Sequence, residues 1–407
     1  MTQLSEARAA YDTLVEKGLS LDMTRGKPGP EQLTLSEPLL SILTPDDVAG
    51  EGGDYRNYGL PAGIPEARRL FGDYLGVGAD QVIVGGNSSL QLMHYAVTFA
   101  VTQGVPGSDG PWGHTAKVLC PVPGYDRHFA VCASLGLEMV PVPMTDSGPD
   151  MEVVRELVAD PRVKAMWNVP KYSNPTGVTY DDATVDALAA METAAPDFRL
   201  LWDNAYQVHH LGDGPAPLKE IVSACADAGH PNRPLVFGST SKVTLPGAGV
   251  AAFASSEANV ADMLRKLSFV TIGPNKLNQL RHVRFFGDLA GIEAHMNRHA
   301  ALLAPKFAAV DQALSTHLSG LVSWTTPRGG YFVSVDVPPG CARRVVELAA
   351  GAGVKLTPAG ATWPGGDDPE DRNLRLAPTL PPLERIEQAM AVFCACVTLA
   401  AAERSAA

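Results

Sequence analysis

The sequence predicts an α/β fold built on a large, mostly parallel sheet that is covered by helices on both faces. From about residue 65 to residue 255, short apolar runs alternate with helical periods, which is the pattern of strands joined by crossover helices. Several of these runs are apolar without alternation, as expected for strands that are buried on both faces. After Glu257 the pattern changes to long helical stretches and then to a second set of short strands. We therefore expect a smaller α+β domain beside the large one.

Seven strands are expected in the large sheet. Their ranges are 81–85, 116–122, 137–142, 163–169, 199–203, 234–238 and 249–255. Helices are expected from Asn275 to Phe286 and on to about His317. The smaller unit should contain strands at 322–324, 330–336, 354–358 and 373–378 and a closing helix at 383–402. We assign residues 46–300 to the large domain and residues 1–45 and 301–407 to the small domain.

The composition restricts the kinds of partner. A formal net charge of −12 repels phosphodiester backbones and anionic lipid, which argues against nucleic acid or a membrane as a partner. The six cysteines include no CxxC pair, and no histidine cluster has metal-ligand spacing, so we expect a reducing cytoplasm and no metal. The N-terminus lacks the pattern of an export signal, and no run approaches the roughly 18 apolar residues of a membrane helix.

Polar motifs stand at the ends of the expected strands, where ligands of such sheets bind. They read GGNSS (85–89), PVPGYD (121–126), NPTG (174–177), DNAY (203–206) and STSK (239–242). In this order and spacing they resemble the class I aminotransferases of fold type I, over nearly the whole chain. Within that class, the segments DMTRGKPGP, YRNYGLPAGIPEARRLF, TSKVTLPGAGVAAF and IGPNKLNQLRHVRF are similar to a bacterial subgroup of aspartate aminotransferases.

The resemblance implies the fold of PLP-dependent transferases of fold type I and the cofactor pyridoxal 5'-phosphate. It also implies a ping-pong reaction that moves an amino group between an amino acid and a 2-oxo acid, with L-aspartate and 2-oxoglutarate as the favoured pair. Members of this family work as homodimers with shared active sites, so a homodimer is expected here.

Three residues are expected to carry the catalytic chemistry. Lys242 follows a strand and three small positions, so its amine can reach a cofactor aldehyde, and the resemblance makes it the Schiff-base lysine; the alternative is a solvated loop lysine. Asp203 ends an apolar strand, where a buried carboxylate needs a cationic partner such as the protonated pyridine nitrogen; the alternative is a helix N-cap. Tyr206, by resemblance, hydrogen-bonds the phenolic oxygen of the cofactor together with Asn174, although NPTG alone could also be a turn.

A phosphate site is expected where a helix starts directly after the first strand of the large sheet. Free N–H groups at a helix start bind phosphate, and Gly86, Asn87 and Ser88 are the candidates. Simple N-capping by Asn87 is the alternative. Ser239 should add a hydroxyl from the other side, and Tyr58, by resemblance, reaches the phosphate from the neighbouring subunit.

One departure from the family concerns the cation at this phosphate. Many relatives carry an arginine about eight residues after the lysine, and Gly249 occupies the aligned place here. Because charge-assisted hydrogen bonds are about twice as strong as neutral ones, another cation should approach the phosphate. Our hypothesis is Lys276, acting from its own or from the partner subunit.

The substrate is expected to meet Arg375, which by resemblance binds its α-carboxylate through a planar fork; an exposed strand arginine is the alternative. Asn174 and Gly26 are the other expected substrate contacts. Tyr125 matches the family position whose ring stacks on the pyridine, with a core tyrosine as the alternative.

A dicarboxylic substrate needs a second cation, and the relatives' arginine for that role is missing near Val270. Four side chains stay open for it: Arg25, Lys27, Lys276 and Arg281. An aminotransferase for another amino acid and a β-lyase on the same scaffold also stay open, since a fold does not fix the reaction. A non-catalytic regulator that senses pyridoxal phosphate is disfavoured, because we see no DNA-binding extension and no basic patch.

Overall fold

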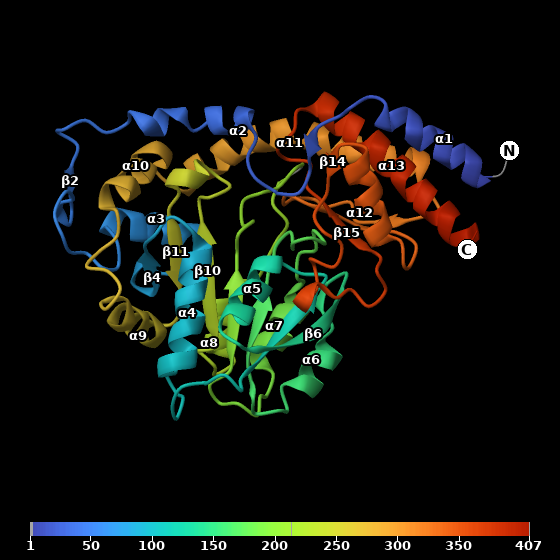
Figure 1. The fold of residues 1–407 in the computed structure, drawn as a ribbon. Coiled ribbons are helices and arrows are strands. Elements are labelled where there is room, and N and C mark those ends of the chain that lie inside the picture. Colours follow the sequence, from blue (N-terminus) through green and yellow to red (C-terminus); the bar gives the residue numbers. More distant parts are fainter. Residues whose placement is uncertain (1–2, 213, 407) are drawn as a thin grey trace.

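The computed structural model describes residues 3–212 and 214–406, and its centre is a mixed sheet of eight strands in the order β4-β11-β10-β9-β8-β5-β6-β7 (Figure 1). The strands are β4 (Val82–Val84), β5 (Lys117–Val122), β6 (Glu138–Thr145), β7 (Gly148–Pro149), β8 (Val163–Asn168), β9 (Arg199–Asp203), β10 (Pro234–Ser239) and β11 (Ala251–Ala254). All seven predicted strands are confirmed. The eighth, β7, has only two residues, which is too short to leave an apolar run in the sequence.

The sheet is mostly parallel, as predicted. Strands β6, β5, β8, β9 and β10 pair in parallel, while β11 runs antiparallel to β10 and β4, and β7 runs antiparallel to β6. The carboxyl ends of five neighbouring strands therefore meet at one edge of the sheet. This arrangement brings together the loops that carry the predicted site residues.

Helices cover both faces of the sheet. One layer contains α3 (Pro65–Leu75), α6 (Met151–Leu157), α7 (Asp182–Ala190), α8 (Ile221–Asp227) and α10 (Lys276–Phe286), and the other contains α4 (Ser89–Gln103), α5 (Asp126–Ser134) and α9 (Glu257–Leu267). Alternate residues of one strand face the two layers: Leu200 and Trp202 of β9 join the first core and Leu201 joins the second. Burial on both faces explains why this strand is apolar without alternation.

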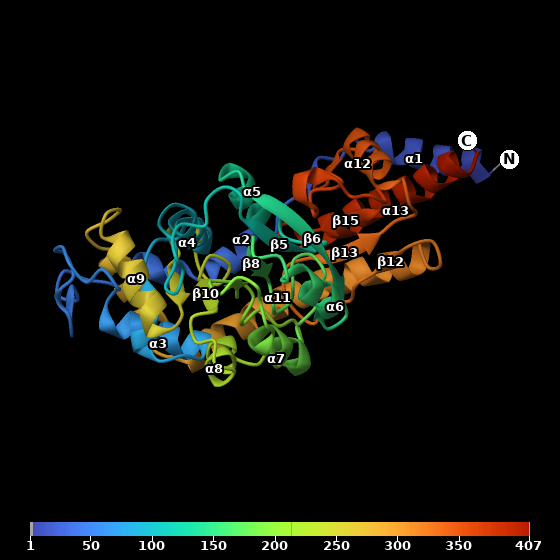
Figure 2. The ribbon, with the colours of Figure 1, turned by 90° about the horizontal axis from the view of Figure 1, so that it is seen from below.

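A second unit combines the two ends of the chain. Strands β12 (Ser323–Trp324), β13 (Val333–Asp336) and β15 (Asn373–Leu376) form an antiparallel sheet, and β14 (Val354–Lys355) pairs in parallel with β1 (Leu21–Asp22). Helix α13 (Leu383–Ala406) packs against α1 (Gln3–Val15), α11 (Leu289–His317) and α12 (Ala342–Gly351). Both views show the two termini side by side, at the end formed by α1 and α13 (Figures 1 and 2). The expected strand at 354–358 forms over only two residues.

The remaining elements are a short helix, α2 (Pro30–Thr34), and a small hairpin of β2 (Ala49–Gly50) and β3 (Gly53–Asp54). One hydrophobic core joins α1, β1, the second half of α11 and the C-terminal elements. The predicted domain boundary at residue 300 falls inside α11, and the division into two domains stays a prediction.

Helix α13 is also the one helix in the described ranges that is long and apolar enough to cross a membrane. Of that apolar stretch, 61% is buried against the rest of the chain, which is typical of a core helix.

Candidate active site

Lys242 lies in the turn that follows β10. Its amine stands 4.9 Å from the centroid of the Tyr206 ring, in contact with the protein instead of pointing into open solvent. Burial lowers the pKa of the Lys242 amine, and the Asp203 carboxylate offsets part of that effect. A lowered pKa increases the neutral fraction of the amine, which is the form that can act as a nucleophile or base.

Asp203 is the last residue of β9 and is 2% exposed. Its Oδ2 accepts a hydrogen bond from Nε2 of His128 at 2.9 Å, while Oδ1 is buried without any partner in the described chain. No helix begins at Asp203, so the N-cap alternative is wrong. A buried carboxylate oxygen that lacks a donor is costly, and a protonated ring nitrogen of a ligand would satisfy it.

Two tyrosines lie close to this carboxylate. Burial raises the pKa of Tyr206 and of Tyr125, and Asp203 adds to both increases, so both hydroxyls keep their protons. The Tyr125 ring meets His128 edge to face at 4.9 Å between centroids. Tyr125, His128 and Asn174 line the same small pocket. The structure therefore brings together the residues that were predicted around the pyridine ring.

The predicted phosphate residues also converge. Ser239 at the end of β10 lies 3.2 Å, oxygen to oxygen, from Ser241, whose hydroxyl donates to the carbonyl of Asn87 at 3.3 Å. The loop after β4 is thus tied to the loop after β10. Ser88, not Asn87, is the N-cap residue of α4, so the N-capping alternative for Asn87 is wrong. Gly86 adopts φ 72°, a conformation that favours glycine at this tight turn.

The cation at the phosphate stays a prediction. A Cβ at Gly249 would lie 3.2 Å from the Asn87 carbonyl oxygen, so the position that is aligned with the family's arginine is next to the predicted cradle. The Lys276 amine donates to the carbonyl of Gly59 at 3.1 Å, beside Tyr58, whose side chain is 81% exposed. Lys276 therefore lies next to the segment that contains Tyr58, and the role of each residue at the phosphate stays a prediction.

Arg375 is buried, so the alternative of an exposed strand arginine is wrong. One terminal nitrogen donates to Asp126 at 2.8 Å and to Oδ1 of Asn174 at 3.2 Å, and the guanidinium lies 4.9 Å from the centroid of the Phe332 ring. A Cβ at Gly26 would come within 2.5 Å of that ring, so only glycine lets this segment approach Phe332. The predicted substrate residues Arg375, Asn174 and Gly26 are therefore close together.

His128 was missed by the sequence analysis. It is 2% exposed, stacks on Trp167 at 4.1 Å between ring centroids and supplies the only donor to the Asp203 carboxylate among the described residues. Its position three residues after Tyr125 could have indicated that His128 points toward the same site, since residues three apart in a helix share a face. A single histidine without a partner motif gave no other indication.

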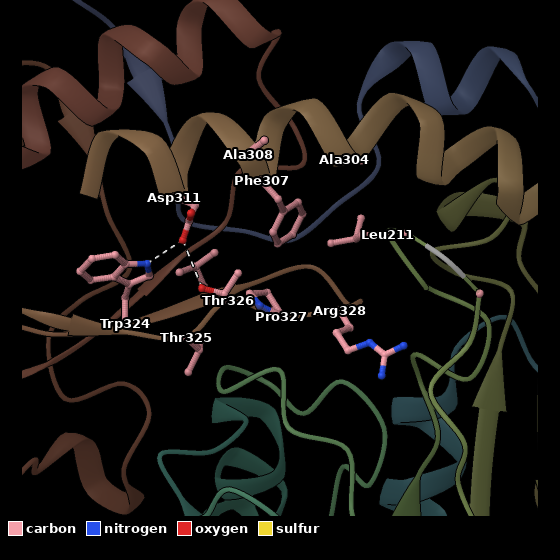
Figure 3. A pocket seen from close by; sticks show the side chains of 13 residues that line it. Leu211, Ala304, Phe307, Ala308, Asp311, Trp324, Thr325, Thr326, Pro327 and Arg328 are labelled. Carbon is pink, nitrogen blue, oxygen red and sulfur yellow. Dashed lines mark hydrogen bonds between the residues drawn. The ribbon is translucent and has the colours of Figure 1, made fainter. Parts of the chain in front are cut away.

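A separate cavity of about 400 Å³ lies between α11 and the strands of the small sheet (Figure 3). Phe307 and Trp324 line it, and Asp311 accepts hydrogen bonds there from Trp324 and Thr326. None of the predicted site residues lines this cavity, so it is distinct from the candidate active site.

The chain is similar to known proteins over nearly its whole length. A family model described as aspartate amino-transferase matches residues 2–407. The chain is 49% identical over 406 residues to an aspartate aminotransferase of Corynebacterium glutamicum, covering 98% of this chain and 94% of that protein. The crystal structure of an aspartate transaminase from the same species has a TM-score of 0.97 at 48% identity, covering 98% and 96%.

A more distant structure shares the fold. The α-aminoadipate aminotransferase from Thermus thermophilus, complexed with N-(5'-phosphopyridoxyl)-L-leucine, has a TM-score of 0.77 at 20% identity, covering 100% of this chain and 96% of that one. Together with the family match, this similarity confirms the predicted fold class. The chain belongs to the aspartate aminotransferase family of pyridoxal-phosphate-dependent enzymes.

Proposed function

We propose that this enzyme moves an amino group between L-aspartate and 2-oxoglutarate, giving oxaloacetate and L-glutamate, as a cytoplasmic homodimer. The observation that carries the proposal is the position of the Lys242 amine over Tyr206, beside a buried Asp203 carboxylate with one unpaired oxygen. The relative of 49% identity named aspartate aminotransferase supports the choice of substrate.

The residues present fit pyridoxal phosphate. Oδ1 of Asp203 would accept a hydrogen bond from the protonated ring nitrogen, and His128 holds the other carboxylate oxygen. Tyr206 and Asn174 would hold the phenolic oxygen, and Ser239 and the loop from Gly86 to Ser88 would hold the phosphate. When bound, the cofactor supplies an aldehyde for Lys242 and a protonated ring that accepts electrons from the α-carbon of the substrate.

Lys242 then performs two tasks. Its amine would hold the cofactor covalently through the aldehyde and would be released when the amine of the substrate takes its place. Because burial lowers its pKa, the freed Lys242 amine could take the proton from the α-carbon of the substrate and deliver it to the cofactor carbon that bears the transferred nitrogen.

Arg375 orients the amino acid for this transfer. Asp126 and Asn174 hold one terminal nitrogen, which leaves the other arms of the guanidinium for the α-carboxylate. Of the four open candidates for the second carboxylate, Arg25 and Lys27 flank Gly26, which lies against Phe332 beneath Arg375. We therefore favour this segment as the source of the second cation.

The test mixes the purified holoenzyme with aspartate, glutamate, alanine and an aromatic amino acid in turn, while the cofactor spectrum is followed. We expect aspartate and glutamate to convert the cofactor to its amino form and to release their oxo acids, and Lys242→Ala to do neither. Conversion by alanine or the aromatic amino acid alone would refute the substrate assignment. With tyrosine or tryptophan as the aromatic amino acid, release of pyruvate, ammonia and the free aromatic ring compound without the amino form would identify a β-lyase.

A further inference from the structure

The backbone that carries Lys242 is held by side chains from distant parts of the chain. Residues 240–244 form a turn that does not continue as a helix, and the carbonyls of Lys242 and Val243 take side-chain donors. The Lys242 carbonyl accepts from the Tyr331 hydroxyl at 3.1 Å and from Nε2 of His209 at 3.3 Å. The next carbonyl, of Val243, accepts from Nε2 of His295 at 2.8 Å.

Gln32 fixes the orientation of the Tyr331 hydroxyl. The single hydroxyl proton points at the Lys242 carbonyl, so the Tyr331 oxygen accepts from Nε2 of Gln32 at 3.0 Å. Oε1 of Gln32 accepts from the backbone N–H of Gly29, also at 3.0 Å. A flipped Gln32 amide would place two donors face to face at Gly29, so only one arrangement satisfies every group. Gln32 is 1% exposed and Tyr331 is fully buried, so water does not compete for these bonds.

The far end of this hydrogen-bond chain is the segment predicted to meet the substrate. Gly29 lies three residues after Gly26, which is in tight contact with the Phe332 ring under Arg375. Tyr331 and Phe332 are neighbours in the sequence, and one holds the Lys242 carbonyl while the other packs against the guanidinium of Arg375. The chain from Gly29 to Lys242 therefore connects the substrate segment with the catalytic lysine.

We propose that Tyr331, held by Gln32, is a positioning residue that fixes the peptide of Lys242 and so aims its amine at the reacting carbon. The inference rests on the proposed function, in which Lys242 bonds to the cofactor and moves a proton at the α-carbon. A lysine side chain is flexible along its whole four-carbon stem, so the aim of its amine depends on a fixed backbone. Without the Tyr331 hydroxyl, the Lys242 carbonyl keeps only the longer bond to His209.

The test compares Tyr331→Phe with a matched control, Tyr11→Phe. Tyr11 is also a buried tyrosine whose hydroxyl donates to a backbone carbonyl, that of Leu348 at 2.9 Å, but it packs against the terminal helices. Two rates are measured: attachment of pyridoxal phosphate to Lys242 in the apoenzyme, by visible absorbance, and the single-turnover reaction with aspartate and with α-deuterated aspartate. Gln32→Met and the double variant Gln32→Met/Tyr331→Phe complete a mutant cycle.

We expect Tyr331→Phe to slow both rates by about five-fold, the effect of one lost hydrogen bond of average strength, and to increase the isotope effect. The KM for aspartate should stay within about two-fold of wild type, and Tyr11→Phe should change neither rate by more than about two-fold. Gln32→Met should slow attachment in the wild-type background and add little in the Tyr331→Phe background, because it acts through the hydroxyl.

Equal rates for Tyr331→Phe and Tyr11→Phe would overturn the proposal, as would full additivity of Gln32→Met and Tyr331→Phe. If Tyr331→Phe does not fold, Gln32→Met against Tyr11→Phe decides the same question by the attachment rate. A wild-type enzyme that attaches pyridoxal phosphate but takes no amino group from aspartate would refute the proposed function, while the attachment rates would still test Tyr331.

Discussion

Replacing Asp203 by asparagine removes one charge from the candidate site and almost no volume. The asparagine oxygen can still accept from His128, which now stands 2.9 Å from the carboxylate. The amide nitrogen then occupies the place of the unpaired Oδ1 and presents a donor where the cofactor ring also presents one. The substitution therefore changes an attraction into a repulsion and leaves the local packing intact.

The expected loss of reaction rate in Asp203→Asn can be calculated from the geometry. A carboxylate and a ring cation at hydrogen-bond distance, about 3 Å, attract each other by about 5 to 6 kcal/mol at an effective dielectric constant of about 20. Each 1.36 kcal/mol is a factor of ten in rate, so the half-reaction with aspartate should slow by up to about 10⁴-fold.

The assay is the single-turnover conversion of the cofactor by aspartate, followed in the visible spectrum. Asp197→Asn is the matched control, because Asp197 is also a buried carboxylate, paired with Lys164 at 2.6 Å and placed just before the opposite end of β9. The control should lose stability and keep its rate within a few-fold. An Asp203→Asn enzyme that reacts within ten-fold of wild type would refute the charge-pair argument.

Three further predictions concern the substrate, the dimer and acid stability. Arg375→Lys keeps the positive charge but loses the planar guanidinium that can bind both carboxylate oxygens. One lost charged hydrogen bond of about 1.5 to 3 kcal/mol should raise the KM for aspartate by about 10- to 100-fold in steady-state assays. A change in KM below two-fold contradicts binding of the α-carboxylate by Arg375. Tyr58→Phe should weaken cofactor binding. In a hybrid dimer of one Tyr58→Phe subunit and one Lys242→Ala subunit, the site that keeps Lys242 should bind the cofactor with wild-type affinity, because it receives Tyr58 from the other subunit. Weak binding at that site would show that Tyr58 acts within its own subunit. Burial lowers the pKa of His282 from 6.5 to about 4. The buried neutral side chain therefore contributes about 3 kcal/mol to the free energy of unfolding, and this contribution is complete above pH 6.5 and is lost as the pH falls toward 4. His282→Gln should therefore reduce the drop in the thermal unfolding midpoint between pH 7.5 and 5, and an unchanged drop would contradict this assignment.

The strands and the residues at their carboxyl ends could be predicted because they leave local patterns. Lys242 and Asp203 each follow a recognisable apolar run, and each belongs to a motif with a fixed place in the chain order. The short strand β7 and the pairing of β14 with β1 could not be predicted. The first has two residues, and the second joins segments more than 300 positions apart.

The side chains that support the site were also beyond sequence reasoning. His128 stands alone in a helix, and its contact with Asp203 depends on the packing of α5 against the strand. Gln32 and Tyr331 are separated by almost 300 residues, so their hydrogen bond exists only through the tertiary fold. The roles of Tyr58 and Lys276 at the phosphate stay predictions, because the structure describes one chain.

Tyr331 and Phe332 share one peptide bond, and they contact two different residues of the candidate site: Tyr331 holds the Lys242 carbonyl, and Phe332 packs against Arg375. The peptide bond between them therefore couples the backbone that carries Lys242 to the surroundings of the Arg375 guanidinium. Substitutions of the residues around the distal end of the substrate should therefore be able to change the preferred amino acid. Insertions or deletions near this dipeptide should instead reduce the activity toward every substrate alike.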